Sequence, residues 1–241
     1  MPIPIPTVPK IYYEDDDRDR LFNYHPDFHP EDAPDNKEKW IDLVEYLQDN
    51  RTLFLFQELK NEVTNQIIGL MLYLDFEEEA TIRLYINSPG GSILNALALQ
   101  NSIWSLSSPI QTLGIGRVAS MAAVVLASGD KKRRVAFPST RIMVHIPRPK
   151  KKPHKKKKQK EKPNPRDKYY AAEAVISNAI HQDKLTLRLA TFFSHVSGRS
   201  VDRIFEELSQ DVFMSAEEAK DFGLIDRIVE PKPETETETE N

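Results

Sequence analysis

The sequence contains no cysteine among its 241 residues. A disulfide framework, a zinc site built on thiolates and a cysteine nucleophile are therefore excluded, so catalysis must use oxygen or nitrogen chemistry. No run of apolar residues approaches the roughly 18 that a membrane-spanning helix needs. A Walker loop of the form GxxxxGK followed by Ser or Thr is also missing, so any ATP hydrolysis must come from a partner.

Charge is distributed very unevenly along the chain. The formal net charge is −4, yet residues 148–168 hold 12 Lys or Arg against two acidic residues, a net charge of +10, which leaves −14 on the remainder. The N-terminus has neither the charged-then-apolar order of a signal peptide nor the acid-poor composition of a transit peptide, because Glu14 to Asp17 are all acidic. We therefore expect the protein to be made in the compartment where it works.

Three segments lack the pattern of a packed core. Residues 1–37 are rich in proline and acidic groups, and we expect a flexible N-terminal segment. Residues 148–168 form a lysine–proline insertion without an apolar face, which predicts a solvated loop; binding to nucleic acid or an anionic surface is the alternative. Residues 231–241 alternate Glu and Thr after two prolines and are predicted to be a disordered acidic tail.

Residues 38–230 are predicted to form one α/β domain with repeated βαβ units. Apolar residues from Trp40 to Leu47 recur at helical spacing, and further segments follow either helical or alternating patterns. Helices are predicted over 63–74, 92–106, 120–128 and 171–196, and strands over 52–56, 81–87, 110–114, 134–137 and 142–145.

Three polar residues stand at the edges of apolar stretches, in the order Ser120, His145 and Asp211. A strand or helix end can hold such a side chain rigidly and still expose it to a substrate. A serine hydroxyl is a poor nucleophile unless an imidazole takes its proton and a carboxylate fixes the imidazole tautomer. These residue types therefore indicate a serine hydrolase.

Each of these residues also has a purely structural interpretation. Ser120 precedes a helix of small residues and could be its N-cap, and Asp211 could cap the acidic helix that follows it. His145 could be a satisfied structural residue at a strand end. Gly90 and Gly91 could form only a tight turn, where glycine permits positive φ.

Four blocks of sequence resemble one protein family. The blocks are INSPGGS at Ile86–Ser92, ASM at Ala119–Met121, RIMVHIP at Arg141–Pro147 and DVFMSAEEAKDFGLID at Asp211–Asp226. In this order they resemble the proteolytic subunit of the Clp protease, ClpP. The proline-rich opening and residues 65–71 are most similar to the plastid-encoded members of that family.

The resemblance implies a crotonase-like ClpP fold with a protruding handle helix. It implies that Ser120 is the nucleophile, that His145 is the general base and then the general acid, and that Asp211 orients the imidazole. The backbone N–H groups of Gly91 and Met121 would form the oxyanion hole. The implied activity is that of a serine endopeptidase, which cleaves unfolded proteins to short peptides inside a barrel-shaped complex.

The same resemblance implies the partners and the location of the protein. We expect other Clp proteolytic subunits in two stacked heptameric rings, an AAA+ Clp chaperone that uses the ATP, and no cofactor in this subunit. Neither a membrane nor a nucleic-acid partner is expected. The implied location is the chloroplast stroma, with the bacterial cytoplasm as the alternative.

The sequence departs from the family pattern in several places. Ala122 stands where the family usually has Gly, Ile146 where it has Gln, and Phe56 where it often has Gly, and the added bulk predicts slower or more restrictive cleavage. The insertion 148–168 replaces the strand that pairs across rings and flanks substrate. Two alternatives remain: a structural ring subunit impaired in catalysis, and a crotonase-type acyl-CoA enzyme that uses carboxylates in place of the Ser/His pair.

Overall fold

The computed structural model describes residues 7–11, 38–145 and 165–230, and the chain divides into two compact units, residues 1–53 and 54–241. In the first unit, β1 (Thr7–Ile11) pairs antiparallel with β2 (Glu38–Asp42). Helix α2 (Leu43–Asp49) follows directly. The prediction that Trp40 begins a helix is wrong, because the β1–β2 pairing places Trp40 in a strand, opposite Pro9. The rest of the N-terminal segment 1–37 lies outside the described residues.

The second unit contains the main sheet, which begins with β3 at the boundary between the units. Its elements alternate between strands and helices along most of the chain. They are β3 (Thr52–Leu55), α3 (Asn61–Glu77), β4 (Ile82–Ser88), α4 (Ile93–Ser105), β5 (Ile110–Ala119), α5 (Met121–Ala127), β6 (Arg134–Ala136), β7 (Arg141–Val144), α6 (Pro165–Ser197), α7 (Val201–Glu207), β8 (Val212–Met214), α8 (Ala216–Phe222) and β9 (Arg227–Ile228).

The sheet runs β3-β4-β5-β6-β9, and β7 leaves this path to pair with both β5 and β8. The pairs β4–β5, β5–β6 and β5–β7 are parallel, as repeated βαβ units require, whereas β7–β8 is antiparallel. Strand β5 is longer than the predicted 110–114, because it pairs first with β6 through Thr112–Gly114 and then with β7 through Arg117–Ala119.

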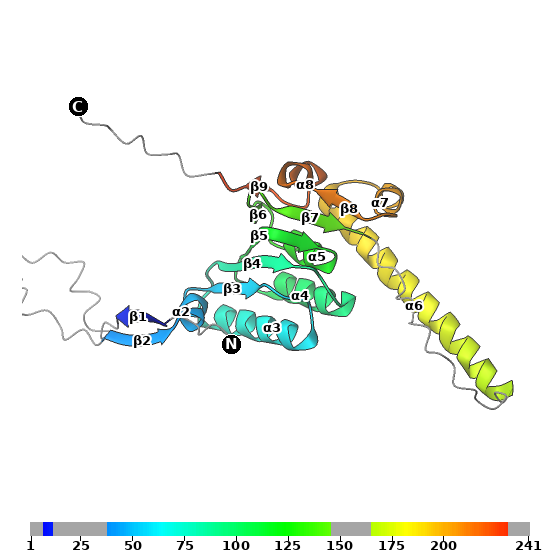
Figure 1. Cartoon of the computed structure of the whole chain (residues 1–241), viewed down its shortest axis with the longest axis horizontal. Coiled ribbons are helices and arrows are strands. Elements are labelled where there is room, and N and C mark those ends of the chain that lie inside the picture. The colour runs from blue at the N-terminus through cyan, green and yellow to red at the C-terminus, as the bar shows by residue number, and fades with distance from the viewer. Residues whose placement is uncertain (1–6, 12–37, 146–164, 231–241) are drawn as a thin grey trace, which may run out of the picture. The chain divides into compact units, whose positions relative to one another are not determined.

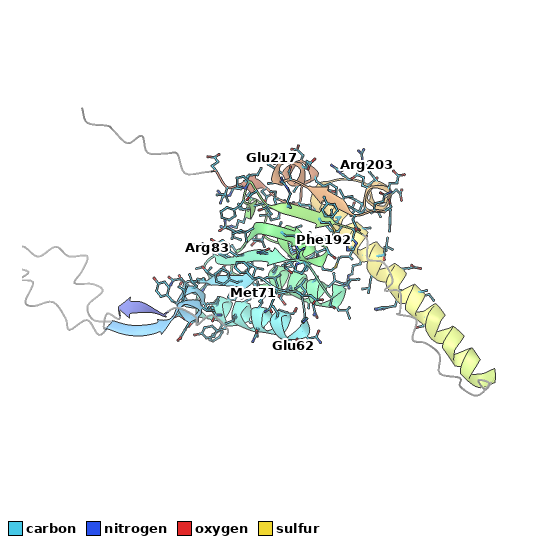
Figure 2. All side chains as sticks on the ribbon, in the orientation of Figure 1. Glu62, Met71, Arg83, Phe192, Arg203 and Glu217 are labelled. Atoms are coloured by element: carbon cyan, nitrogen blue, oxygen red, sulfur yellow. The ribbon has the colours of Figure 1, made fainter. Side chains whose placement is uncertain are left out.

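Strand β4 alternates strictly between buried and more exposed side chains. Ile82, Leu84 and Ile86 are completely buried, and Ser88 continues the same face at 1% exposure. Helix α3 places an apolar stripe that includes Met71 against this core, whereas Glu62 in its first turn is exposed. Figure 2 labels both residues, together with the exposed Arg83 of β4. The core therefore closes around the end of β4 and buries a serine hydroxyl there.

Helix α5 is buried along its entire length. All seven residues from Met121 to Ala127 are at most 3% exposed. Small and aliphatic side chains let this short helix pack beneath β4, β5 and β7. Its N-terminal end is consequently held in place by the surrounding core.

Helix α6 is longer than the predicted 171–196 and extends beyond the rest of the second unit (Figure 1). Its C-terminal part packs into the core through Leu189, Ala190 and Phe193, whereas Ile180 is half exposed. The last four residues of the insertion, 165–168, belong to α6. Residues 148–164 of the insertion and the tail 231–241 lie outside the described residues.

An ion pair between the buried Arg134 and the partly buried Asp226 joins β6 to the C-terminal end of the domain. The Arg134 guanidinium donates Nε–H and Nη2–H to the two carboxylate oxygens of Asp226 at 3.0 and 2.6 Å, and it also donates to the Gly223 carbonyl. The Arg134 residue is only 8% exposed. Burial raises the pKa of the Asp226 carboxyl, but the hydrogen bonds and charge of Arg134 outweigh it, so the net pKa lies below its usual value.

Asp226→Asn is expected to lower the free energy of unfolding by about 3 kcal/mol at pH 7, because it leaves a buried guanidinium without its counter-charge. The folded-state pKa of Asp226 is lowered. The stabilisation that the Asp226 carboxylate provides is therefore fully present above its unfolded-state pKa of about 3.9. It is lost as the pH falls through the lower folded-state pKa. Urea titrations at pH 7 and at successively lower pH measure the difference from wild type.

The difference should shrink in acid, since both proteins then lack the carboxylate charge. The exposed Asp221→Asn in α8 is the matched control and should change stability by no more than about 0.5 kcal/mol. A difference for Asp226→Asn that stays constant across the pH series would contradict the assignment.

Candidate active site

Ser120 lies at the junction between β5 and α5, in a backbone conformation that L-amino acids rarely adopt. Its φ is 56° and its ψ is −124°, and its N–H donates to the Met143 carbonyl at 2.7 Å. A non-glycine residue at such angles costs about 1–3 kcal/mol, and such strain is concentrated at functional sites. The buried helix α5 and the β7 backbone hold Ser120 in this conformation.

Strand register brings the three candidate residues together. Ala119 pairs with Met143 across β5 and β7, so Ser120 and His145 leave neighbouring parallel strands at the same edge. Val144 pairs with Val212 across β7 and β8, which places Asp211 opposite His145. The juxtaposition of residues far apart in sequence follows from these two pairings.

The side chains form a continuous chain of contacts. Ser120 Oγ lies 2.8 Å from His145 Nε2, and His145 Nδ1 lies 3.2 Å from Asp211 Oδ1. With the imidazole proton on Nδ1, the ring donates to the carboxylate and accepts from the hydroxyl. The His145 side chain is 23% exposed and Ser120 is itself partly exposed, so a substrate can reach both groups. This arrangement can remove the serine proton as the oxygen attacks a carbonyl.

Neither Ser120 nor Asp211 makes the helix-capping hydrogen bond that its structural interpretation requires. Ser120 occupies the N-cap position of α5, but its side chain makes no capping hydrogen bond and contacts His145 instead. Helix α8 is capped by Ser215, whose hydroxyl accepts from the Glu218 N–H while the Glu218 carboxylate accepts from the Ser215 N–H. Asp211 is therefore not the cap of α8.

The Gly90–Gly91 loop packs directly against Ser120. Gly90 has a φ of +90°, and a Cβ there would lie 2.6 Å from the Ala119 carbonyl oxygen and 2.9 Å from the Met121 nitrogen. At Gly91 a Cβ would lie 2.6 Å from the Leu59 carbonyl oxygen. Glycine at position 90 thus permits a close approach to the serine, and glycine at position 91 permits a close approach to Leu59, beyond what a simple turn requires.

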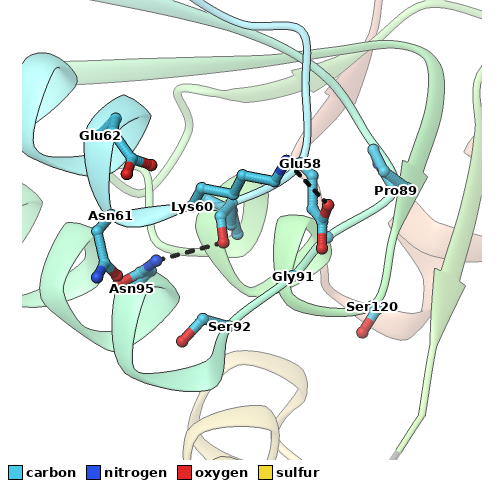
Figure 3. A pocket seen from close by; sticks show the side chains of 11 residues that line it. Glu58, Lys60, Asn61, Glu62, Pro89, Gly91, Ser92, Asn95 and Ser120 are labelled. Carbon is cyan, nitrogen blue, oxygen red and sulfur yellow. Dashed lines mark hydrogen bonds and ion pairs between the residues drawn. The ribbon is translucent and has the colours of Figure 1, made fainter.

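The two predicted oxyanion donors have no acceptor among the described residues. Within the described part of the chain, neither the Gly91 nor the Met121 backbone N–H donates to another protein group. Gly91 and Ser120 both line a cavity of about 570 Å³, and Figure 3 shows Ser120 beside the Pro89–Ser92 segment. Further along, the cavity is lined by polar side chains that include Glu58, Lys60 and Asn95.

Near this cavity lie one residue that departs from the family pattern and two that were not predicted from the sequence. Ala122, one of the departures from the family pattern, is completely buried and does not line this cavity. Ser88 and Leu59, which hold the glycine loop by hydrogen bonds, were not among the residues predicted from the sequence. For Ser88 a signal existed, because the alternation of β4 continues through it and predicts a buried hydroxyl.

Comparison with known proteins agrees with this geometry. The profile of the Clp protease family matches residues 35–161 and 165–232, which is most of the chain. The chain belongs to the Clp protease family. The four sequence blocks that suggested this family lie at the glycine loop, the serine junction, β7 and the β8–α8 region.

Individual relatives from algae, plants and cyanobacteria carry the name ATP-dependent Clp protease proteolytic subunit. The protein from Chlorella vulgaris is 35% identical over 79% of this chain and 87% of its own length. The Sorghum bicolor protein is 34% identical over 80% of this chain and 82% of its own length. In Prochlorococcus marinus, subunit 2 is 37% identical over 80% of this chain and 87% of its own length.

A solved structure confirms the predicted ClpP fold. A mutant of ClpP1 from Listeria monocytogenes superimposes with a TM-score of 0.66, covering 79% of this chain and 97% of its own, at 23% sequence identity. The long helix α6 corresponds to the predicted handle. Among the described residues, no helix is both long enough and apolar enough to span a bilayer.

Proposed function

We propose that this chain is a catalytically competent serine endopeptidase subunit of a Clp protease, with Ser120, His145 and Asp211 as its catalytic residues. One observation carries the proposal: the continuous hydroxyl–imidazole–carboxylate contact, at 2.8 and 3.2 Å, beside a cavity lined by Ser120 and Gly91, where the Gly91 and Met121 N–H groups have no acceptor among the described residues. A subunit with only a structural role would need neither the strained serine nor the open donors. A crotonase-type enzyme would rely on carboxylates in place of the Ser/His pair.

The geometry supports a two-step acyl transfer. Ser120 Oγ attacks the peptide carbonyl while His145 Nε2 takes its proton, and the resulting oxyanion accepts hydrogen bonds from the Gly91 and Met121 N–H groups. One such donor typically lowers the barrier by about 2.7–4 kcal/mol. His145 then donates the proton to the leaving amine, and water hydrolyses the acyl-enzyme with His145 again as base. Asp211 holds the imidazole in the tautomer that both steps require.

The family also informs the proposed assembly and location. The relatives are named as subunits of an ATP-dependent protease, and this sequence has no Walker loop, so we assign ATP use to an AAA+ partner and no cofactor to this subunit. We propose that it joins other proteolytic subunits in two stacked heptameric rings around unfolded substrates. Algal, plant and cyanobacterial relatives favour the chloroplast stroma, with the bacterial cytoplasm as the alternative.

A fluorophosphonate probe tests the proposal in the native assembled complex. The probe reacts only with an activated serine, and we expect mass spectrometry to locate it on Ser120 of the wild-type chain. His145→Ala, which keeps the nucleophile but removes its base, should abolish labelling. If this chain stays unlabelled in an intact complex whose other subunits react, it is a structural subunit and the proposal fails.

A further inference from the structure

Ser88 is a buried polar residue at the end of the strand that leads into the active-site loop. It is the last residue of β4 and is only 1% exposed. The alternation of β4 points its side chain into the core alongside Ile82, Leu84 and Ile86. A hydroxyl at such a position must satisfy its hydrogen bonds within the protein, because leaving it unpaired costs about 1–3 kcal/mol.

The Ser88 hydroxyl makes two hydrogen bonds, and these connect two loops of the active site. Ser88 Oγ donates to the Gln57 carbonyl at 2.6 Å and accepts from the Gly90 N–H at 3.1 Å. Gln57 follows β3, and Gly90 is the residue whose backbone packs against Ser120. One side chain therefore ties the glycine loop to the neighbouring connection.

Leu59 holds the other side of the same loop. Its N–H donates to the Gly90 carbonyl at 2.8 Å, and its own carbonyl accepts from the Ser92 N–H at 3.2 Å. The peptide between Gly90 and Gly91 is planar and trans, so its C=O and N–H point in opposite directions. Fixing the Gly90 carbonyl on Leu59 therefore fixes the direction of the Gly91 N–H.

A peptide between two glycines rotates easily unless its neighbours restrain it, because neither residue has a side chain that restricts φ and ψ. The hydrogen bonds to Ser88 and Leu59 restrain both polar groups of Gly90. The Gly91 N–H is then left without an acceptor among the described residues, at the cavity that Ser120 also lines. Its orientation is set before any substrate arrives, as electrostatic stabilisation of a transition state requires.

We propose that Ser88 is a positioning residue for the oxyanion hole: its buried hydroxyl orients the Gly91 N–H toward the developing oxyanion without contacting the substrate. This inference rests on the proposed function, because an oxyanion forms only if Ser120 acylates. It adds a role for a side chain of β4, which the assignment of the three catalytic residues does not include.

The test compares Ser88→Ala with wild type in the assembled complex, using the fluorophosphonate probe and a fluorogenic peptide. The other subunits of the complex carry serine-to-alanine substitutions, so that only this chain turns over. Removing one oxyanion donor outright costs about 10²–10³ in kcat. We expect Ser88→Ala to lose about 10- to 100-fold, because Leu59 still holds the Gly90 carbonyl and Met121 still donates.

The loss should fall on kcat and on the maximal labelling rate, with KM and the probe's binding constant nearly unchanged. The pH profile of kcat/KM should also be unchanged, since the His145–Asp211 contact is not altered. Ser108→Ala is the matched control: Ser108 is also a buried serine, at 2% exposure, whose hydroxyl donates to a backbone carbonyl, and its loss should leave kcat unchanged. Ser88→Thr keeps the hydroxyl and should recover most of the rate.

Several results would overturn the proposal. In the first, the Ser88→Ala complex keeps kcat within about twofold of wild type, whereas Ser120→Ala abolishes turnover. This result rejects the role of Ser88 and leaves the proposed function intact. Retained turnover in Ser120→Ala rejects the proposed function and this inference together. If Ser88→Ala does not assemble, Ser88→Cys replaces it, since the thiol fills the same space but bonds weakly. Unchanged kcat in Ser88→Cys would then contradict the proposal.

Discussion

Ser120→Ala is expected to lower kcat for peptide hydrolysis by about 10⁶-fold, and His145→Ala by a similar factor. The nucleophile and its base act as one unit, because the 2.8 Å contact transfers a single proton in the step that either substitution blocks. The double variant should therefore be scarcely worse than either single variant. Independent contributions would instead multiply to a far larger loss.

The measurement requires a complex in which only this chain is active. The partner subunits carry their own serine-to-alanine substitutions, and a fluorogenic peptide reports kcat for wild type, both single variants and the double variant. Residual activity should still exceed the uncatalysed rate by about 10³–10⁴, since the Gly91 and Met121 donors remain. A loss of less than tenfold in Ser120→Ala would show that a different group performs the chemistry.

Asp211→Asn is expected to lower kcat by about 10⁴-fold while leaving the fold intact. The Asp211 carboxylate accepts from the Nδ1–H of His145, which leaves Nε2 free to accept the serine proton. An asparagine can place its NH₂ group against Nδ1 instead, and the ring proton then moves to Nε2. That tautomer cannot take the proton from Ser120.

Asp202→Asn is the matched control for this change. Asp202 is an exposed carboxylate in the first turn of α7, so neutralising it alters charge without touching the imidazole. Turnover in this control should match wild type. Asp211→Ala should be about as slow as Asp211→Asn, since both fail to hold the productive tautomer. Equal activity of Asp211→Asn and wild type would instead assign the orienting role to another group.

The sequence predicted the βαβ core and the order of the candidate residues, for identifiable physical reasons. Strand β4 and helix α3 carry long apolar patterns with clear periods, and those patterns survive because one face of each element is buried. The residue types at element ends left structural interpretations open, and the three candidate residues could be selected only because the sequence blocks around them resemble the Clp protease family. Their contact distances could not be predicted, because these depend on the registers of β5, β7 and β8.

The short strands that the sequence did not predict are ones that only tertiary pairing creates. Strands β8 and β9 contain three and two residues, too few to show any period, and they exist because β7 and β6 provide partners. Strand β5 was predicted to end at residue 114, but it continues to Ala119 because its second half pairs with β7 instead of β6. The role of Ser88 depends on its exact partners, Gln57 and Gly90, and these emerge only when the loops are folded together.

Because His145 and Asp211 are attached to adjacent strands, the connection between them is free to diverge in sequence and length. The pairing of β7 with β8 fixes both side chains locally, so the 65 residues between them need only begin and end in register. Extending such a connection costs little closure entropy, roughly 0.6 kcal/mol for each doubling in length. That stretch contains the lysine-rich insertion and all of α6, so its length and charge can diverge while the proton relay stays in place.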